Sequence, residues 1–363
     1  MIYKHFYKII FAFLFTWSFF PKSNAQSISD SKHITRSLPV SRETSIEVSN
    51  KYGNITIETW NYDSVKFVIV ATASADKAAD ASLSLSNIDF QFINTSNYVM
   101  AKTLFINPTR AIINDLKSIF SRSNNMNIDY KIYVPKTVNL KLDNKFGDIF
   151  AGALEGSIAI KQAYGNLKIF KIEGQLKTEL NYVDNAEIDR ITRGICQISF
   201  SHVYIKNAVT LDIKSSASKI EINQVEDLQL ESLNDETNIF NVANAELNTK
   251  FSKTTIESFG KSFIGNTRFG TLTFRKLNPG FSKINIGARY TDMNIFFDTD
   301  NVGFDIEIDN QRSRLMYPRM YNLKEETVNP KEAIYRTIGH IGKASDSKIY
   351  IDAVYGNINL KMK

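Results

Sequence analysis

Apolar and polar residues alternate along most of the chain with a period of two, which is typical of β-strands rather than helices. Leu176, Thr178 and Leu180 share one face of such a run, and Lys177 and Glu179 lie between them. The same alternation returns in three later segments: 196–200, 211–217 and 247–251. The pattern therefore predicts short strands that each have one apolar face and one polar face.

The residues that close these alternating runs recur at a nearly constant interval. They are Phe146, Tyr164, Tyr182, Phe200, Ala217, Asn234, Phe251, Phe269 and Tyr290, spaced by subtraction at 18, 18, 18, 17, 17, 17, 18 and 21 residues. A unit of this length holds two or three short strands but cannot bury its apolar face alone. We therefore expect an all-β fold, a parallel β-solenoid with about 17–18 residues per coil. A β-sandwich also suits regular short strands, but it gives no reason for the constant interval.

An aromatic residue followed by glycine stands at five of the predicted corners. The five pairs are Tyr52 and Gly53, Phe146 and Gly147, Tyr164 and Gly165, Phe269 and Gly270, and Tyr355 and Gly356. A dinucleotide-binding loop needs several glycines at fixed offsets before a helix, whereas here a single glycine precedes another strand. We expect the glycine to take a positive φ, a following Asn or Asp to cap the corner, and the aromatic ring to fill the interior.

Two segments interrupt the period, one at about 71–126 and one at about 310–343. The first contains two helix-like stretches, Ala75–Leu85 and Ala111–Arg122, and the second is polar and is expected to be irregular. Because the ends of a solenoid expose unpaired strand edges, we interpret both segments as covers or flanking inserts.

The first residues resemble a secretory signal peptide. Lys4 and Lys8 precede an apolar run at 9–20, and small residues follow at 23–25. An uncleaved anchor is the alternative, although the run is shorter than the roughly 20 residues that span a membrane. We expect a signal peptide at 1–25 and one solenoid domain at 26–363, exported to the periplasm or cell surface, with no later transmembrane segment. The only cysteine, Cys196, lies far from the cleavage site, so no lipobox cysteine is present.

The charge of the chain argues against nucleic acid as the main partner. The formal net charge is +6, and removal of residues 1–25, which contain three lysines and no acidic residue, leaves 6 − 3 = +3. Nucleic-acid-binding proteins carry clustered Lys and Arg in excess of this balance. Envelope glycans or surface proteins are the expected partners.

The sequence offers few side chains for catalysis or metal binding. His33, His202 and His340 form no zinc-binding pair, and no cofactor or metal site is predicted. Cys196 and His202 are close enough in sequence to suggest a Cys–His nucleophile. The alternation instead places Cys196 on the apolar face, so we expect a buried thiol that acts as a small hydrophobe.

Carboxylates gather near two predicted corners. They are Asp184, Glu187 and Asp189 at one corner, and Asp227, Glu231, Asp235 and Glu236 near the other. Stacked carboxylates can flank a glycosidic bond or bind calcium, so a carbohydrate-active enzyme (a lyase or hydrolase) is the alternative function. Lys and Glu occupy outward positions throughout, however, and a solvated face explains them equally, so no catalytic residue is assigned.

Aromatic residues outside the inward pattern are candidates for a binding surface. They are Phe170, Tyr204, Phe240, Phe296 and Phe297, with Tyr317, Tyr321 and Tyr335 in the second insert. Inserts packed over these rings are the alternative explanation.

Four segments together resemble a known family. They are Asn50–Trp60, Tyr130–Phe150, Ala163–Gly174 and Val354–Met362. Taken together, and in this order along the chain, the four segments resemble the bacterial "putative adhesin" domain-of-unknown-function family of exported Bacteroidota-type proteins. The resemblance implies a β-helical fold and export, and it transfers no catalytic residue. The expected function is an exported, non-enzymatic, adhesin-like scaffold that presents stacked rows of side chains to glycan or protein partners.

Overall fold

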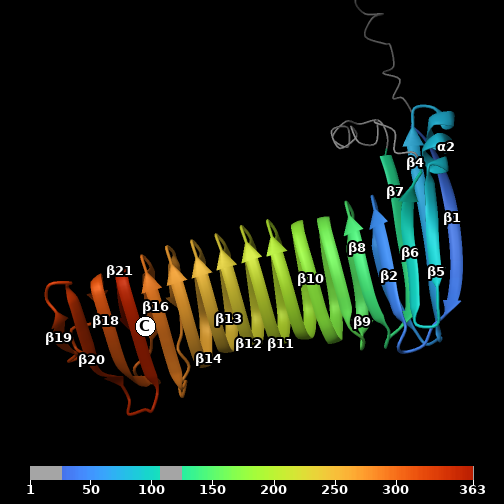
Figure 1. Cartoon of the computed structure of the whole chain (residues 1–363). Helices are drawn as coiled ribbons and strands as arrows, with labels where there is room; N and C mark the ends of the chain where they lie inside the picture. Colours follow the sequence, from blue (N-terminus) through green and yellow to red (C-terminus); the bar gives the residue numbers. More distant parts are fainter. Residues whose placement is uncertain (1–26, 107–124, 363) are drawn as a thin grey trace, which may run out of the picture.

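The computed structural model describes residues 27–106 and 125–362, which form an elongated molecule built almost entirely from β-strands (Figure 1). The prediction of an all-β protein is confirmed. The signal peptide at 1–25 and the helix-like stretch Ala111–Arg122 lie outside the described residues. Within the described residues, no helix is long and apolar enough to cross a membrane.

The middle of the molecule is a ladder of parallel strands. Its elements are β8 (Asn139–Lys145), β9 (Ile149–Leu154), β10 (Ile158–Ser199), β11 (His202–Ser216), β12 (Lys219–Leu233), β13 (Glu236–Lys250), β14 (Lys253–Arg268), β15 (Thr271–Phe274), β16 (Lys283–Arg289) and β17 (Asp292–Phe297). Ile158 pairs with Leu140, 158 − 140 = 18 residues earlier, and Ile220 pairs with Val203, 220 − 203 = 17 residues earlier. We call each such passage a winding, and the pairing repeats the interval seen in the sequence.

Every residue that closes a winding between Phe146 and Tyr290 lies in the left-handed region, with φ between 49° and 61°. This conformation costs a non-glycine residue about 1–2 kcal/mol, and it reverses the alternation of side chains. Leu180 and Val183 are buried, for example, whereas Tyr182 between them is 47% exposed. The expectation that the aromatic rings fill the interior is therefore wrong, because the left-handed residue turns its own side chain outward.

The interior of the windings is packed with aliphatic columns. Ile205, Ile222, Ile239 and Ile256 pair in register on four successive windings, and each is fully buried. A single winding could not bury these side chains, whereas stacked windings form one continuous core.

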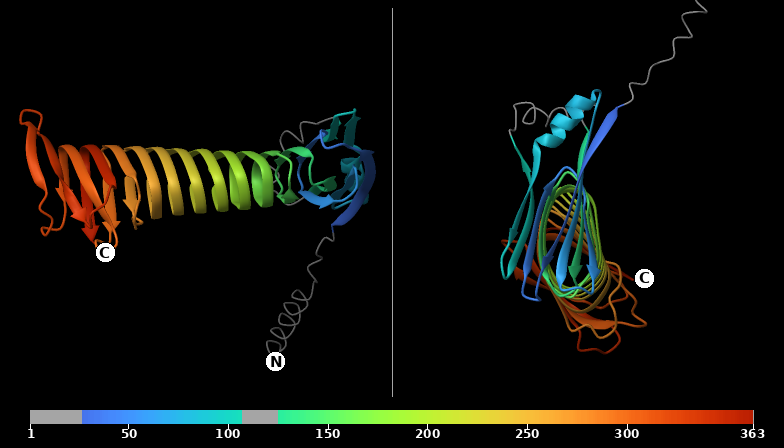
Figure 2. Two further views of the ribbon diagram at one scale, coloured as in Figure 1. Left: turned by 90° about the horizontal axis from the view of Figure 1, so that it is seen from below. Right: turned by 90° about the vertical axis from the view of Figure 1, so that its right-hand side faces the viewer.

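The N-terminal end is wider than the ladder and contains antiparallel strands (Figure 2). Its elements are β1 (Ile28–Pro39), β2 (Ser45–Lys51), β3 (Ile55–Trp60), β4 (Ser64–Ala75), α2 (Ala78–Ser86), β5 (Ile88–Asn94), β6 (Tyr98–Phe105) and β7 (Asn125–Pro135). Strand β2 lies between β6 and β8, and β3 lies between β7 and β9. The first interruption of the period therefore lies at this end, and the helix expected at 75–85 is α2.

The C-terminal end reverses the order of the chain. Its strands are β18 (Gly303–Met316), β19 (Lys324–Asn329), β20 (Ile334–Gly342) and β21 (Lys348–Met362). Strand β21 is last in the sequence, yet it pairs in parallel with β16 and β17 on one side and with β18 on the other. Strands β18, β20 and β19 then pair antiparallel. The segment 310–343, expected to be irregular, is therefore largely β-structure, and the exposed, charged β19 ends the sheet.

Candidate functional site

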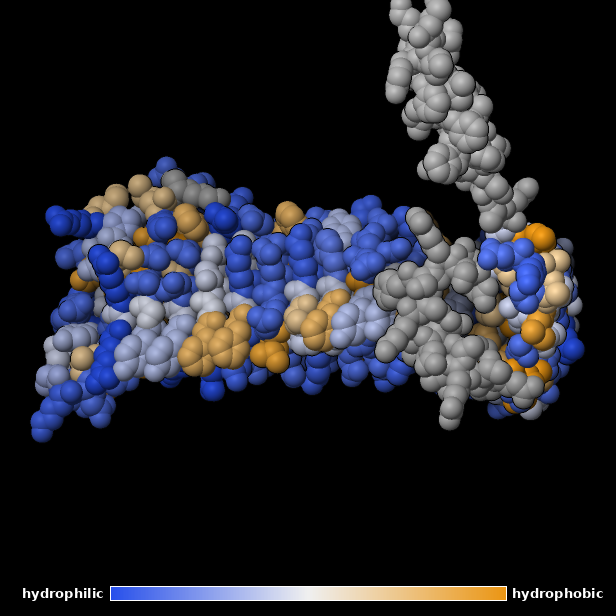
Figure 3. Space-filling view, turned by 90° about the horizontal axis from the view of Figure 1, so that it is seen from above, coloured by the Kyte–Doolittle hydropathy of each residue, from blue (hydrophilic) through white to orange (hydrophobic). Residues whose placement is uncertain are grey.

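The left-handed residues place a line of aromatic rings along the outside of the windings. This aromatic column consists of an N-terminal run (Tyr52, Phe146, Tyr164, Tyr182 and Phe200) and a C-terminal run (Phe251, Phe269, Tyr290 and Tyr355). Within each run, neighbouring ring centroids lie 4.7–5.5 Å apart and ring planes differ by only 4–14°. Figure 3 shows orange and pale side chains along the molecule, flanked by blue polar surface.

The rings of the column follow the spacing of the strands that carry them. Their centroid separations of 4.7–5.5 Å are close to the roughly 4.8 Å between neighbouring strands, and they exceed the roughly 3.5 Å of rings in full face contact. The six rings from Tyr164 to Tyr290 are 41–54% exposed. The column is a corrugated apolar strip with a regular step.

The glycine after the ring is required by the neighbouring winding. A Cβ placed on any of the five corner glycines would lie 2.0–2.3 Å from a backbone carbonyl oxygen of an adjacent segment. For Gly147 that atom is the oxygen of Gly53, and for Gly53 it is the oxygen of Ile128 in β7. Positive φ values occur at Gly53, Gly165 and Gly356 but not at Gly147 or Gly270. The expectation of a positive-φ glycine is thus met at three corners, and the shared reason for glycine is the lack of room for a Cβ.

The Asn or Asp after the glycine binds the next winding rather than its own corner. The Asn54 side-chain oxygen accepts a hydrogen bond from the Asp148 backbone N–H at 2.8 Å, and Asp148 Oδ1 accepts one from the Asn166 N–H at 2.7 Å. Asp292, which follows Thr291 instead of a glycine, accepts in the same way through Oδ1 from the Asn357 N–H at 3.0 Å. These side chains satisfy corner N–H groups that the bent ladder leaves unpaired.

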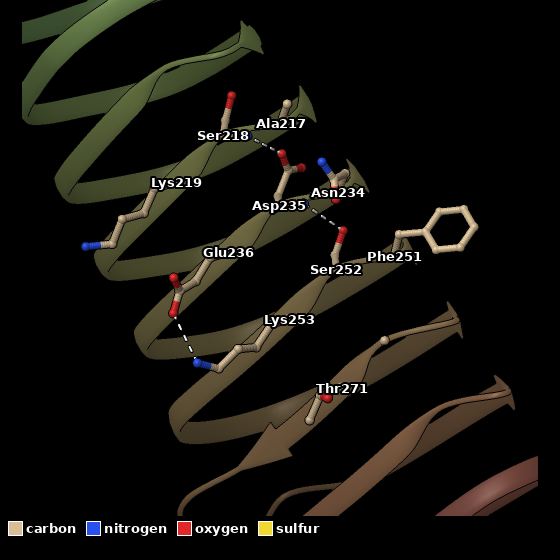
Figure 4. Close-up of a pocket in the computed structure, with 11 residues that line it drawn as sticks. Ala217, Ser218, Lys219, Asn234, Asp235, Glu236, Phe251, Ser252, Lys253 and Thr271 are labelled. Atoms are coloured by element: carbon tan, nitrogen blue, oxygen red, sulfur yellow. Dashed lines mark hydrogen bonds and ion pairs between the residues drawn. The ribbon is translucent and has the colours of Figure 1, made fainter.

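In the central windings, polar side chains replace the corner glycine. The Ser201 N–H donates to Ser218 Oγ at 3.1 Å. The Ser218 N–H donates to Asp235 Oδ1 at 2.7 Å, and the Asp235 N–H donates to Ser252 Oγ at 3.1 Å (Figure 4). Each corner is thereby hydrogen-bonded to the next one.

Asp235 is the centre of this hydrogen-bond series. Its carboxylate also accepts the Ser215 and Ser232 hydroxyls at 2.6 and 2.7 Å and the Leu233 N–H at 3.1 Å. Asp235 is only 5% exposed, so the prediction that it belongs to a cluster of outward carboxylates is wrong. The left-handed Asn234 before it turns Asp235 inward.

Ala217 and Asn234 occupy the left-handed positions between the two aromatic runs. A shallow depression of about 590 Å³ lies beside this break, and its lining includes Asn234, Glu236, Phe251 and Lys253. Figure 4 shows Phe251 projecting outward at one end of the depression. The break exposes polar groups between two apolar strips.

Four of the six other clustered carboxylates are engaged between windings, whereas Asp184 is exposed and Asp189 is half-buried. Glu187 pairs with Lys168 at 2.9 Å, Glu231 with Lys214 at 3.1 Å, and Glu236 with Lys253 at 3.2 Å. Asp227 accepts a hydrogen bond from the Asn244 amide at 2.8 Å. Within residues 27–106 and 125–362, no group of three His, Cys, Asp or Glu side chains is placed to hold a metal ion.

Cys196 is 1% exposed, as expected for a small hydrophobe. Burial raises the pKa of its thiol to about 11, so the reactive thiolate does not form at neutral pH. His202 Nε2 instead lies 3.3 Å from Glu221 Oε1.

Of the aromatic residues proposed from the sequence, Phe170 and Phe240 are exposed at 59% and 42%. Phe297 is buried, and Tyr317 and Tyr321 pack against the core. Sequence reasoning missed the column because it placed those rings inside. The missed signal was the repeated ring at the position where each alternation ends.

No family model matches this sequence, and no curated protein matches it. Three solved structures are similar to the chain at 10–14% identity. A "putative cell adhesion protein" from Clostridium sporogenes covers 92% of this chain and 100% of its own, with a TM-score of 0.20. A "putative adhesin" from Bacteroides fragilis covers 91% and 97%, with a TM-score of 0.23. A "putative lipid binding protein" from Parabacteroides distasonis covers 72% and 96%, with a TM-score of 0.36.

Two of these names agree with the adhesin resemblance in a coarse sense. Because all three TM-scores are below 0.5, these likenesses assign neither a ligand nor an activity to this chain.

Proposed function

We propose that the protein is an exported, non-enzymatic binding scaffold of the cell envelope or surface. Its windings form a parallel β-solenoid, in one domain at 26–363 that follows a cleaved signal peptide. The aromatic column is the binding surface, and an extended glycan is the partner that it fits best. The observation that supports this proposal is the pair of regularly stepped runs of stacked rings, of which the six from Tyr164 to Tyr290 are exposed.

The physical basis is the match between a repeating surface and a repeating polymer. Aromatic rings offer rigid apolar area at low entropic cost, and sugar rings present apolar C–H faces that pack on them. Each ring is fixed by its backbone corner and by its stacked neighbours, so little order is lost on binding. One weak contact per sugar, repeated along the column, gives useful affinity through the number of contacts.

The carboxylates support a scaffold over the alternative enzyme. A glycosidase needs two carboxylates that face one substrate bond. Here Glu187, Glu231 and Glu236 pair with lysines across windings, and Asp235 is buried in a corner. A smooth charged face with a separate aromatic strip is suited to binding rather than to bond cleavage.

A glycan array probed with residues 26–363 tests the proposal. We expect binding to extended polysaccharides and a loss of at least about tenfold in affinity when Phe251 and Phe269 are both replaced by alanine. The matched control is Phe240→Ala, because Phe240 is 42% exposed but lies outside the column. Circular dichroism verifies that the variants stay folded. Wild-type affinity in the double variant, or binding lost equally in the control, would overturn the proposal.

A further inference from the structure

Charged side chains on most of the windings neutralise each other. Lysine and glutamate side chains meet across neighbouring windings with N–O distances of 2.9–3.2 Å in five pairs: Lys141–Glu47, Lys161–Glu179, Lys168–Glu187, Lys214–Glu231 and Lys253–Glu236. Opposite charges at facing positions of adjacent strands stabilise a sheet modestly. These faces therefore present little net charge to a partner.

The row immediately before the aromatic column is different. Lys51 pairs in register with Lys145, Lys250 with Arg268, and Arg268 with Arg289. Like charges at directly opposite positions destabilise a sheet. Among the described residues, Arg289 has an acidic partner, Asp352 at 2.7 Å, whereas the other four form no ion pair with a carboxylate.

These cations lie against the rings of the column. The Lys51 ammonium is 4.5 Å from the centroid of Tyr52, that of Lys145 is 5.3 Å from Phe146, and that of Lys250 is 5.4 Å from Phe251. A cation–π contact holds the ammonium beside the ring but leaves its positive charge in place. Part of each aromatic run is therefore bordered by cations, and Lys51, Lys145, Lys250 and Arg268 pair with no carboxylate of residues 27–106 and 125–362.

We propose that the ligand of the aromatic column is an acidic polysaccharide, whose sugar rings pack on the aromatic rings and whose carboxylates meet the cation row. This inference rests on the glycan-binding function proposed above. A polyanion would relieve the repulsion between facing cations, which a neutral glycan would leave in place. The cations form two short groups in one narrow row, Lys51 with Lys145 and Lys250 with Arg268 and Arg289, separated by uncharged positions from Ala163 to Leu233. On a chain of small net charge, these narrow groups fit a polysaccharide better than the broad basic surface that nucleic acid requires.

Calorimetry with matched polymers tests the charge requirement. The probes are uronate polymers (polygalacturonate, alginate and hyaluronate), each compared with its own methyl ester, which keeps the sugar rings and removes the charge. We expect at least one acid form to bind about tenfold more tightly than its ester. That difference should shrink between about 50 and about 200 mM salt.

Two variants locate the effect. Lys250→Gln combined with Arg268→Gln should lower binding of the acid form toward the level of the ester and leave binding of the ester unchanged, because Lys51 and Lys145 remain beside the N-terminal run. Lys214→Gln is the matched control, because Lys214 is an exposed strand lysine that pairs with Glu231. It should leave the preference for the acid form intact.

The outcomes separate this inference from the function on which it rests. Esters that bind as well as acids, with binding lost in the Phe251 and Phe269 variant, would retain the glycan scaffold and overturn the acidic ligand. Failure of every polysaccharide to bind would overturn both. Tighter binding of a single-stranded oligo(dT) than of any uronate polymer would also overturn the acidic polysaccharide and identify the row as a nucleic-acid site.

Discussion

Most windings use one of two kinds of corner after a residue in the left-handed conformation, and Val183 and Thr291, after Tyr182 and Tyr290, belong to neither kind. The glycine corners are Gly53, Gly147, Gly165, Gly270 and Gly356, where a carbonyl oxygen of the neighbouring winding occupies the place of a Cβ. The side-chain corners are Ser201, Ser218, Asp235 and Ser252, where an oxygen of one corner accepts a hydrogen bond from the N–H of the corner before it. The path of the chain is similar, but the contact between windings is different.

The difference shows that the left-handed residue, not the glycine, sets the corner. The next residue can lack a Cβ, as glycine does, so that the adjacent carbonyl oxygen fits. Alternatively, it can carry a side-chain oxygen that accepts a hydrogen bond from the N–H of the corner before it. This explains why the aromatic–Gly phrase is absent between Tyr182 and Phe251 although the spacing of the windings persists. A corner can therefore change residue type while the ladder stays in register.

Replacement of Gly165 by valine should cause the largest loss of stability at either kind of corner. Its Cβ would lie 2.3 Å from the Gly147 carbonyl oxygen, and φ is +128°, so both contact and conformation oppose a side chain. We expect a loss of about 4 kcal/mol in the free energy of unfolding, measured by urea denaturation. Gly260→Ala is the control, because a Cβ there approaches backbone atoms only to 3.4 Å. Equal stability of the two variants would contradict the close-contact explanation of glycine corners.

Asp235→Ala tests the side-chain corners and should have the next largest effect. The substitution removes the acceptor for Ser215, Ser232 and the Ser218 N–H in a buried site. Unpaired buried donors predict a loss of about 3 kcal/mol in the free energy of unfolding. Asp235→Asn keeps one acceptor oxygen and should lose less. If both substitutions were tolerated without loss, the hydrogen-bond series would not hold these corners together.

The period and the residues that close each winding were predictable, because a parity pattern and an interval can be counted in the sequence. The outward direction of the rings was not predictable. One left-handed residue, such as Tyr182, exchanges the inward and outward positions of the strand, and the neighbouring sequence gives no sign of this change. The burial of Asp235 follows from the same reversal.

The position of β21 could not be predicted for a different reason. The segment around Tyr355 has the same phrase as the other glycine corners, and the phrase does not state which neighbour it stacks on. Tyr355 in fact lies against Tyr290, with ring centroids 4.7 Å apart. Strand β19 was also not predicted. Nearly all of its residues are exposed, so its sequence, KEETVN, has no alternation of apolar and polar residues that would indicate a strand.

Asp148→Ala examines the polar residue that follows a glycine corner. Asp148 Oδ1 accepts hydrogen bonds from the backbone and side-chain nitrogens of Asn166 at 2.7 and 3.1 Å, near the surface. Water can replace part of this interaction, so we expect a loss of about 1 kcal/mol, smaller than for Asp235. The exposed Glu246→Ala on β13 serves as the reference substitution. A loss as large as that of Asp235→Ala would show that burial does not distinguish the two kinds of corner.

The smallest effect should be the dependence of stability on pH near neutrality, which we assign to the C-terminal strands rather than to either kind of corner. His340 Nδ1 lies 2.8 Å from Asp305, and Nε2 lies 2.9 Å from the Lys343 carbonyl oxygen. The Asp305 hydrogen bond, opposed by burial and aided by the Lys343 carbonyl, raises the pKa of His340 above 6.5.

A raised histidine pKa means that the folded protein prefers the protonated ring, so this contribution is fully present below pH 6.5 and is lost as pH rises through the folded pKa. Because the His340 side chain is 39% exposed, we expect only a small fall in melting temperature across this range. His340→Gln should remove this part of the pH dependence, measured by thermal melts from about pH 5.5 to about pH 9. An unchanged slope in the variant would contradict the assignment of this pH dependence to the C-terminal strands.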